Sequence, residues 1–361
     1  MKKALTIVGL FIGINANAQV ATSGTNNSGT NASAIGYQSS ATNTVSTAIG
    51  RETLASGITS TAMGYQTSAT NTASTAIGNN STASGVTSTA IGNNSTASGE
   101  TSIAMGFETE ATHSASIAMG YQTTSTQGAS TAMGFKTTAS GFGSTSIGYQ
   151  TTASGYGSTS IGYQTTASGY GSTSIGYQTT ASGNSSTAIG KNTIASDFGS
   201  LVIGQYNLSG STVTNSATEA NYANTAFVIG NGTASNAKSD AFKVMVNGNT
   251  TVGNDLTVSG DIVVSSDARL KANIVSLGAT LAKLLLIDGK TYTMKKDGKQ
   301  KIGVLAQDIQ KVFPELVTTD DKDMLAVNYQ GLVPVLINAL KEQQSEIDEL
   351  KEMFKELIIK Q

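Results

Sequence analysis

Residues 147–176 read IGYQTTASGYGSTSIGYQTTASGYGSTSIG, so the same fourteen letters occur twice in full and then begin a third time. The period extends in both directions, because thirteen glycines stand fourteen residues apart from Gly36 to Gly204. Ile or Met directly precedes each of these glycines, and Ala or Ser stands two residues before all but the last. Composition alone would allow a disordered linker rich in Gly, Ser and Thr. A linker does not need Ile or Met at every fourteenth position, so the register predicts a solenoid.

The length and chemistry of the unit decide which kind of solenoid is expected. Fourteen residues are too few for a helical hairpin, whose repeats run to about thirty residues or more. They fit one coil of a parallel β-structure with two short strands and two turns, and Thr, Ser and Tyr suit a half-solvated pleated surface. A second half-unit repeats Ala from Ala41 to Ala195, with Ser125 as the exception. We expect the Ile and Met side chains to form a continuous thin core, and the aromatic residues after the glycines to stack as an outer ladder.

The S-x-[AS]-[IM]-G pattern resembles the head repeat of YadA-like trimeric adhesins over residues 31–208. That resemblance implies a left-handed parallel β-roll and a homotrimer of such rolls, whereas the period by itself predicts only stacking. Three thin rolls side by side could bury one another's apolar faces. The predicted fold class is therefore mainly β, with a parallel β-roll head of fourteen-residue coils. What the head binds stays open, and a host, matrix or carbohydrate receptor would each suit it.

The chain begins with a predicted secretory signal peptide, residues 1–18. Two lysines open it, residues 4–14 are apolar but too few to span a membrane, and residues 16–18 have the small-x-small form of a cleavage site. Residues 19–30 then form an N-terminal linker. The signal peptide predicts a secreted or cell-surface protein. No later stretch is long and apolar enough for a transmembrane segment. The chain has no cysteine, so no disulfide can stabilise it.

The charge balance and the composition argue against several classes of function. Twenty-one basic against twenty-three acidic residues leave no basic field that would attract nucleic acid. His113, the one histidine, stands in a repeat loop without a cluster of ligand residues, so neither a metal site nor a cofactor is expected. The head carries only scattered acids such as Glu52, Glu100, Glu108 and Asp197, which gives little support to a hydrolase that acts on external glycans.

Residues 209–265 depart from the repeat and are expected to form a β-rich neck. Strand-like stretches occur at 226–232 and 241–252, and further short β segments are expected between Leu256 and Val264. The Asn247-Gly248 pair is typical of a tight hairpin turn. This region resembles the β-rich neck of phage tail fibres and related surface fibres.

Three motifs mark the terminal module, residues 266–361. They are SDARLKANI at 266–274, GVLAQD at 303–308 and FPELV at 313–317. In this order they resemble the endosialidase-type intramolecular chaperone domain, a self-cleaving serine–lysine peptidase family at the C-termini of trimeric fibres. The resemblance implies a small α+β domain that nucleates the trimer and then cuts itself away.

The nucleophile and the base of that family fall on Ser266 and Lys271, and its cleavage point falls between Ser265 and Ser266. A serine hydroxyl becomes nucleophilic when a neighbour takes its proton, and a lysine can serve as that neighbour once burial lowers its pKa. Ser265 is an alternative nucleophile, six positions from Lys271 instead of five. Asp267 and Arg269 are expected to orient the turn. The plainer reading of the same letters is a helix start, with Ser266 or Asp267 as N-cap and Lys271 as a solvated side chain.

From residue 333 to residue 358 the apolar residues follow a heptad pattern, which predicts a C-terminal coiled coil. The a positions are Val333, Leu340, Ile347 and Phe354, and the d positions are Leu336, Gln343, Leu350 and Leu357. Gln343 is the kind of polar core residue that fixes register or oligomeric state. An amphipathic helix packed on its own domain is the other reading of the pattern.

Together these features predict a secreted or cell-surface homotrimeric fibre. Its parts are a β-roll head, a neck, and a chaperone that assembles the trimer and releases itself at Ser265–Ser266. The only enzyme activity expected is this autoproteolysis. One alternative is an adhesin that keeps its terminal domain uncut as a permanent trimer clamp. Another is a phage-type tail fibre that binds a host receptor, although a signal peptide argues against assembly in the cytoplasm.

Overall fold

The computed structural model describes residues 24–211, 213, 215–320 and 323–359. The predicted signal peptide, residues 1–18, lies outside these described residues. The chain divides into two compact units, which we call the head unit (up to Thr257) and the C-terminal unit (from Val258).

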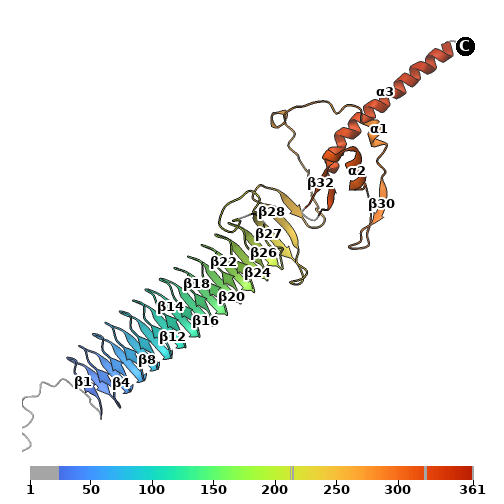
Figure 1. The fold of residues 1–361 in the computed structure, drawn as a ribbon. Coiled ribbons are helices and arrows are strands. Elements are labelled where there is room, and N and C mark those ends of the chain that lie inside the picture. Colours follow the sequence, from blue (N-terminus) through green and yellow to red (C-terminus); the bar gives the residue numbers. More distant parts are fainter. Residues whose placement is uncertain (1–23, 212, 214, 321–322, 360–361) are drawn as a thin grey trace, which may run out of the picture. The chain divides into compact units, whose positions relative to one another are not determined.

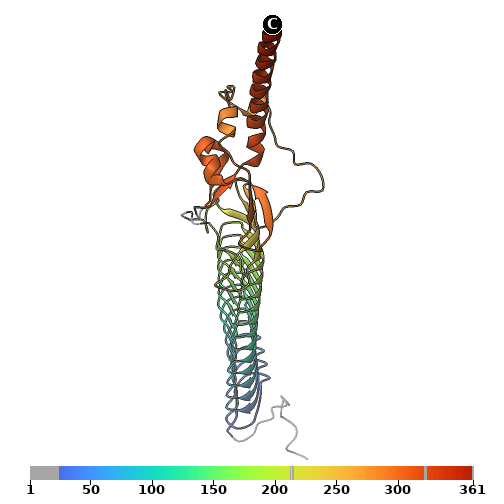
Figure 2. The same ribbon diagram turned by 90° about the vertical axis from the view of Figure 1, so that its right-hand side faces the viewer.

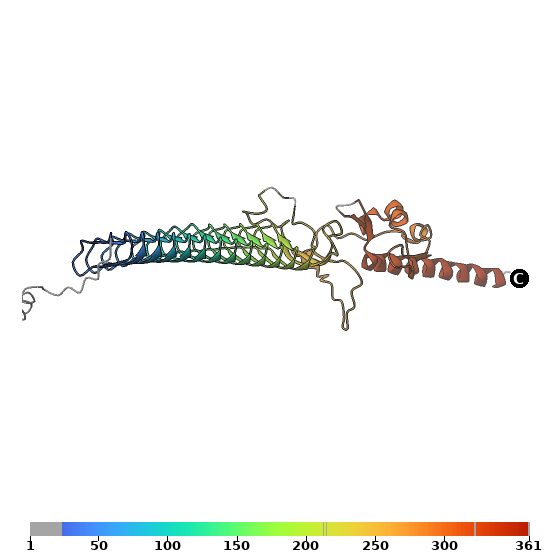
Figure 3. The same ribbon diagram turned by 90° about the horizontal axis from the view of Figure 1, so that it is seen from below.

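The head unit is a parallel β-solenoid in which each fourteen-residue coil gives one strand to each of two sheets (Figures 1 and 3). Neighbouring coils pair in register, so that Thr89 lies opposite Ile103 and Gly92 opposite Gly106. The predicted fold class, a mainly β chain with fourteen-residue parallel coils, is confirmed.

The strands fall into two sets. The first sheet consists of two-residue strands: β1 (Asn26–Asn27), β3 (Ser40–Ala41), β5 (Leu54–Ala55), β7 (Ser68–Ala69), β9 (Thr82–Ala83), β11 (Thr96–Ala97), β13 (Glu110–Ala111), β15 (Thr124–Ser125), β17 (Thr138–Ala139), β19 (Thr152–Ala153), β21 (Thr166–Ala167), β23 (Thr180–Ala181) and β25 (Ile194–Ala195). The second sheet consists of longer strands: β2 (Ser33–Ile35), β4 (Thr47–Arg51), β6 (Thr61–Tyr65), β8 (Thr75–Asn79), β10 (Thr89–Asn93), β12 (Ile103–Phe107), β14 (Ile117–Tyr121), β16 (Thr131–Phe135), β18 (Thr145–Tyr149), β20 (Thr159–Tyr163), β22 (Thr173–Tyr177), β24 (Thr187–Lys191), β26 (Leu201–Gln205), β27 (Thr225–Asn231), β28 (Asp240–Met245) and β29 (Thr250–Val252).

The interior of the coils is filled by Ala, Ser and Thr, and not by Ile and Met. Side chains alternate along each long strand, so Thr89 and Ile91 face outward while Ala90 between them is fully buried. Every Ile or Met before a repeat glycine is at least partly exposed, up to 40% for Ile189. The expected Ile/Met core is therefore wrong. The coil is too narrow for it, since its interior admits only a methyl group or a small hydroxyl.

Many of the buried hydroxyl groups in the coils form hydrogen bonds to the backbone or to one another, whereas others, such as those of Thr53 and Ser144, have no hydrogen-bond partner among the described residues. Ser60 Oγ donates to the Gly57 carbonyl at 2.8 Å. Where Ser146 replaces the core alanine, its hydroxyl lies 2.8 Å from the hydroxyl of Thr151 in the same coil. These bonds allow small polar side chains to share the interior with alanine.

Backbone geometry fixes the turns of each coil. A left-handed residue recurs every seven positions, for example Glu52 (φ 57°) and Thr59 (φ 54°). The repeat glycines have larger positive φ values, such as 128° at Gly120, where a Cβ atom would lie 2.1 Å from the Gly134 carbonyl oxygen. Adjacent coils therefore touch through their backbones at this position, which only glycine allows.

The predicted outer ladder of aromatic rings is confirmed from Phe107 onward, whereas Tyr37 and Tyr65, also expected in it, contact Arg51 of the coil between them. Six rings from Phe107 to Tyr177 stack with centroids 4.9–5.0 Å apart and interplanar angles of 7° or less. A second ladder, which the glycine register did not predict, stacks Phe142, Tyr156 and Tyr170 with centroids 5.1–5.3 Å apart. Both ladders follow from the separation of about 4.8 Å between paired strands.

The parallel sheet continues beyond the last regular coil. β27 pairs with β26 so that Gly230 lies opposite Gly204, 26 positions later in the chain instead of fourteen. The buried carboxylate of Asp197 holds the inserted loop, since it accepts hydrogen bonds from Ser211 N at 2.9 Å and Thr225 N at 2.7 Å. The sheet therefore extends past residue 208, although the regular spacing ends with Gly204.

After β27 the sheet becomes antiparallel. β28 pairs with both β27 and β29, and the predicted Asn247-Gly248 turn joins β28 to β29. Between 256 and 264 the described chain forms no strand, and Leu256 and Val263 are exposed. The expectation of β segments there is wrong, because no strand of the described chain is paired with this stretch.

The C-terminal unit is a small α+β domain. Ile309, Phe313 and Val335 form its buried centre. Its strands pair as two antiparallel hairpins, β30 with β31 and β32 with β33. Its elements are η2 (Ala268–Leu270), α1 (Leu281–Leu284), β30 (Lys290–Thr293), β31 (Gln300–Gly303), α2 (Ala306–Val312), η3 (Pro314–Leu316), β32 (Val317–Thr319), β33 (Leu325–Val327), η4 (Tyr329–Gly331) and α3 (Leu332–Ile359).

Helix α3 presents two different faces. Val335 and Ala339 are buried, whereas the predicted heptad residues Leu340, Leu350 and Phe354 are more than half exposed. In Figure 2 the second half of α3 extends beyond the rest of its unit. Packing on its own domain thus describes the first turns of α3, and the coiled coil stays a prediction. Among the described helices, none is long and apolar enough to cross a membrane.

We expect Gly120→Ala to lower the stability of the head unit by about 3 kcal/mol. The new Cβ atom would overlap the Gly134 carbonyl oxygen of the next coil and would hold an alanine at positive φ. Thermal unfolding followed by circular dichroism measures the loss.

The matched control is Gly157→Ala, at a left-handed position (φ 61°) with no atom within 4 Å of the added Cβ. Ala115 and Ala129 already occupy the equivalent position of other coils, so this variant should carry only the cost of positive φ, about 1 kcal/mol, and lower the midpoint less than Gly120→Ala does. Equal midpoints for both variants would contradict the backbone contact between coils.

Candidate functional site

The motif that opens the C-terminal unit folds as a short turn. Asp267 is the N-cap of η2, and its side chain accepts a hydrogen bond from Arg269 N at 2.8 Å. Aspartate suits this place because its carboxylate satisfies a backbone N–H that a helix start leaves unpaired. η2 ends after Leu270, and the backbone N–H of Lys271 bonds to the Ala268 carbonyl.

This turn brings the two predicted catalytic side chains together. Lys271 Nζ donates a hydrogen bond of 2.7 Å to Ser266 Oγ. Lys271 is bonded to Ser266 and not to Ser265, the alternative nucleophile. The contact has the length that proton transfer between a nucleophile and its base requires. The helix-start reading also holds in part, since Asp267 caps η2.

Exposure is the second feature of the site. Ser266, Lys271 and the residues around them are exposed to solvent in the single chain. A lysine acts as a general base when its ammonium form is desolvated. One chain therefore supplies the contact between the predicted nucleophile and base but not the burial.

A bidentate ion pair lies beside Ser266 and Lys271. Arg269 Nε donates to Asp267 Oδ1 at 3.1 Å, and its Nη2 donates to Asp267 Oδ2 at 2.8 Å. The hydrogen bonds from the Arg269 side chain and backbone hold the pKa of the Asp267 carboxyl below its usual range. The same side-chain bond raises the pKa of the Arg269 guanidinium. Asp267 and Arg269 fix the turn, as expected.

A carboxylate on α3 fixes the chain that follows this turn. Glu342 accepts hydrogen bonds from Leu281 N at 3.1 Å and from Thr280 N at 2.5 Å. The bond from Thr280 N, opposed by partial desolvation, is the main reason that the pKa of the Glu342 carboxyl lies below its usual value. Thr280 is buried, and its hydroxyl donates to the Val335 carbonyl at 3.1 Å.

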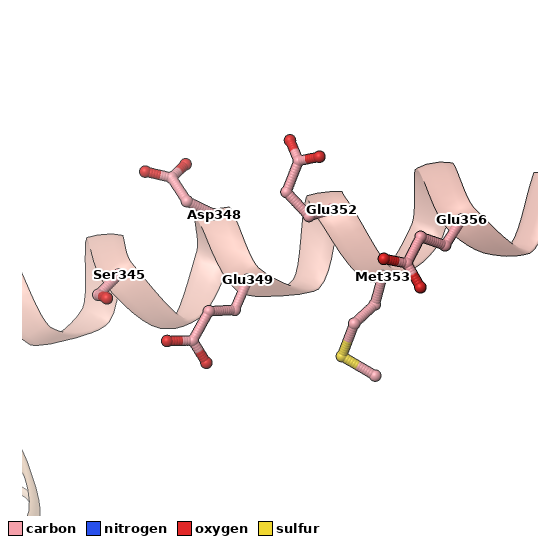
Figure 4. Close-up of a pocket in the computed structure, with 6 residues that line it drawn as sticks. All are labelled: Ser345, Asp348, Glu349, Glu352, Met353 and Glu356. Atoms are coloured by element: carbon pink, nitrogen blue, oxygen red, sulfur yellow. The ribbon is translucent and has the colours of Figure 1, made fainter.

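Two of the surface hollows of the described residues, each of about 540 Å³, lie outside this turn. One lies along the second half of α3, and Figure 4 shows its six lining side chains rising from that single helix: Ser345, Asp348, Glu349, Glu352, Met353 and Glu356. It is an open acidic strip and not an enclosed substrate pocket. The other is an apolar groove on the outer side of the long strands of the head, lined by Ile91, Gly92, Met105, Gly106, Met119, Gly120, Met133 and Gly134.

Neither hollow holds the residues of a metal site. Within the described residues no group of three His, Cys, Asp or Glu side chains could bind a metal ion. His113 lies at an exposed corner of a coil, where its ring Nδ1 is 3.1 Å from the Thr112 hydroxyl.

Comparison with known families identifies both parts of the chain. Residues 266–318 match the family described as chaperone of endosialidase. The YadA head domain repeat matches six stretches, 28–53, 55–81, 83–109, 114–137, 139–165 and 167–193. The chain carries YadA head repeats followed by an endosialidase chaperone domain. Both predicted resemblances are confirmed, in the predicted order.

Curated relatives of the chain are long tail fibre proteins of phages. The chain is 34% identical to long tail fiber protein Gp37 of Salmonella phage S16 over 103 residues, which are 26% of this chain and 14% of that protein. It is 34% identical to Gp37 of Enterobacteria phage Ox2 over 99 residues, 25% of this chain and 39% of that protein. The chain therefore spans less than half the length of these relatives.

Two features of the C-terminal unit were not foreseen from its motifs. The contact of Glu342 with Thr280 joins residues 62 positions apart, and no local pattern signals such a pair. The bidentate geometry of Arg269 on Asp267 could have been anticipated, because an acid and an arginine two positions apart beside an N-cap can share one turn.

We expect Glu342→Gln to accelerate hydrogen exchange of the Thr280 and Leu281 amides severalfold at pH 7, because the neutral amide is a weaker acceptor than the carboxylate. The folded-state pKa of Glu342 is lowered, so its stabilisation is present above the ordinary pKa of glutamate and is lost as the pH falls through the lowered value. The variant should therefore lose the acid-side decrease in protection that the wild type shows. Glu346→Gln, one turn further along α3, is the matched control. Equal exchange in both variants would contradict a stabilising role for the hydrogen bonds from Thr280 and Leu281 to Glu342.

Proposed function

We propose that this protein is a secreted or cell-surface homotrimeric fibre whose chaperone domain assembles the trimer and then releases itself by cleaving the Ser265–Ser266 bond. The observation that carries the proposal is the 2.7 Å contact between Lys271 Nζ and Ser266 Oγ at the start of the matched chaperone domain. The predicted signal peptide supports export, and the head repeats support a role as an adhesin for a host, matrix or carbohydrate receptor.

The chemistry of cleavage follows from the position of the nucleophile. Ser266 contributes both the hydroxyl and the amide nitrogen of the bond that breaks, so attack of its Oγ on the Ser265 carbonyl carbon forms a five-membered ring. Collapse of the ring breaks the C–N bond and leaves the acyl group on Oγ as an ester. Lys271 takes the hydroxyl proton and returns a proton to the departing amine. Water then hydrolyses the ester, which leaves a carboxylate on Ser265 and a free amine on Ser266.

Trimer assembly would supply the burial that the single chain lacks. The residues around Ser266 and Lys271 are exposed in one chain, so a partner that covers them would disfavour the ammonium form of Lys271. The neutral amine could then accept the serine proton. Assembly before cleavage is useful, because parallel β-solenoids with non-local pairing fold slowly and need the chaperone until the strands are in register.

Two apolar surfaces of the chain suit such a trimer. The first is the groove of Ile91, Met105, Met119 and Met133 on the head, which runs across successive coils. The second is the heptad face of α3, with its exposed leucines and phenylalanine. Long apolar surfaces on a soluble protein are typical of association sites. A threefold arrangement of identical chains would cover both surfaces at once.

The tail-fibre alternative has specific support, since the curated relatives are phage long tail fibre proteins. A phage fibre assembles in the cytoplasm, whereas the predicted signal peptide would send this chain out of it. The N-terminal residue of the mature protein separates the two. Gln19 supports export, and an uncut Met1 supports assembly as a tail fibre.

We expect wild-type protein to yield a C-terminal fragment of ninety-six residues, from Ser266 to Gln361. Ser266→Ala and Lys271→Ala should each abolish this fragment, because one removes the nucleophile and the other its base. Intact-mass spectrometry under denaturing conditions, paired with native mass, reports cleavage and trimerisation together. Ser265→Ala is the control and should still be cut. A wild-type chain that stays whole after prolonged folding would contradict cleavage and favour the permanent clamp.

We expect Met119→Glu to lower the temperature at which the trimer dissociates, because it places a carboxylate in the apolar groove of the head. Native mass spectrometry over a temperature series measures this change. The control is Val86→Glu, which adds the same charge at the repeat position that Glu100 already occupies, fourteen residues later. If both variants dissociate at the wild-type temperature, the groove is not the trimer interface.

A further inference from the structure

We propose that Arg269 is a positioning residue for the proposed cleavage. By occupying both oxygens of the Asp267 carboxylate, it prevents that carboxylate from drawing the Lys271 ammonium away from Ser266. The inference rests on the proposed self-cleavage and goes beyond it, since it names the group that decides which partner the lysine takes.

The turn holds one anion and two cations within five residues, so two pairings compete. Asp267 Oδ1 accepts from Arg269 N at 2.8 Å and from Arg269 Nε at 3.1 Å, and Oδ2 accepts from Arg269 Nη2 at 2.8 Å. Lys271 Nζ, in turn, bonds to Ser266 Oγ at 2.7 Å. In the described structure the arginine pairs with the acid and the lysine pairs with the serine.

If Lys271 paired with Asp267 instead of Ser266, it could not act as the base. A lysine paired with a carboxylate is stabilised as its ammonium, and an ammonium has no lone pair for the serine proton. Asp267 lies four positions before Lys271 and is the acid nearest to it in sequence, which makes it the first candidate to compete for the lysine. Arg269 removes this competition by neutralising the charge and by filling the hydrogen-bonding positions of both oxygens.

Arginine is suited to this task and lysine is not. The guanidinium stays protonated at every pH at which cleavage could be assayed, and its planar fork matches both carboxylate oxygens at once. Most exposed ion pairs contribute little, but a bidentate pair that also has a backbone hydrogen bond to the same carboxylate is a favourable geometry. The other charged groups in this turn are Asp267 and Lys271 themselves, and the hydrogen bond of the Lys271 ammonium in the described structure is to Ser266.

The experiment follows the rate of release of the ninety-six-residue fragment from the full chain between pH 6 and pH 10. Arg269→Gln should slow cleavage at least about tenfold at neutral pH and move its rise to higher pH, because the freed Asp267 carboxylate would favour the ammonium form of the lysine. Arg269→Lys should give an intermediate profile, because lysine neutralises Asp267 without bidentate hydrogen bonds.

The deciding variant is the double substitution Asp267→Asn with Arg269→Gln. Asparagine keeps the N-cap of η2 but carries no charge, so the competitor is gone and the need for Arg269 disappears. We expect the double variant to recover the wild-type pH dependence. A double variant with the same displaced profile as Arg269→Gln would show that Arg269 only holds the turn, and would overturn the proposal. Native mass confirms that each variant still assembles.

A second readout does not depend on cleavage. In the Ser266→Ala background, labelling of the Lys271 amine by acetic anhydride is followed against pH by peptide mass spectrometry. Adding Arg269→Gln should move half-maximal labelling to higher pH, and adding Asp267→Asn should reverse the shift. An unchanged labelling curve overturns the proposal. If the curve shifts but wild-type protein is never cut, only the proposed self-cleavage fails.

Discussion

Contact between the backbones of successive coils is the constraint on which the rest of the head depends. At each repeat glycine the next coil approaches so closely that a Cβ atom would lie about 2 Å from a carbonyl oxygen, as at Gly120 and Gly134. Within the regular coils the interior is filled by Ala, Ser and Thr, which are the only side chains small enough for it. A coil of this kind buries little apolar surface, so its stability comes from the hydrogen bonds and ring stacks that it shares with its neighbours.

The same narrow interior explains why the largest apolar side chains lie on the outside. Met119 and the Ile and Met residues at the same position of neighbouring coils cannot fit inside the coil. They line a groove on its surface instead. A protein that places its best hydrophobic groups outside its own core has stability left to gain from association. This supports the proposal that three chains complete one another, with α3 adding a second unpaired apolar face in the C-terminal unit.

The period, the two strands per coil and the outer aromatic ladder could be predicted because each depends on the register alone. Which side chains point into the coil could not be predicted from the register. Alternation along a strand puts either Ala90 or Ile91 inside, and hydrophobicity favours Ile91, but the width of the coil admits Ala90. In the chaperone domain the contact of Ser266 with Lys271 was foreseen from family motifs. The bond from Thr280 to Glu342 was not, because it depends on how α3 packs.

That bond connects the two activities proposed for the chaperone domain. Helix α3 carries the heptad face, and through Glu342 it also holds Thr280 and Leu281, shortly after the turn that contains Ser266 and Lys271. In the proposed trimer, association of α3 helices would therefore hold the chain at Thr280 and Leu281, and partner chains would cover the exposed turn. Asp267 and Arg269 already fix the local geometry in a single chain, so the proposed assembly would have only to exclude water from the turn. In this proposal, cleavage that waits for burial would act only after three C-terminal units have come together.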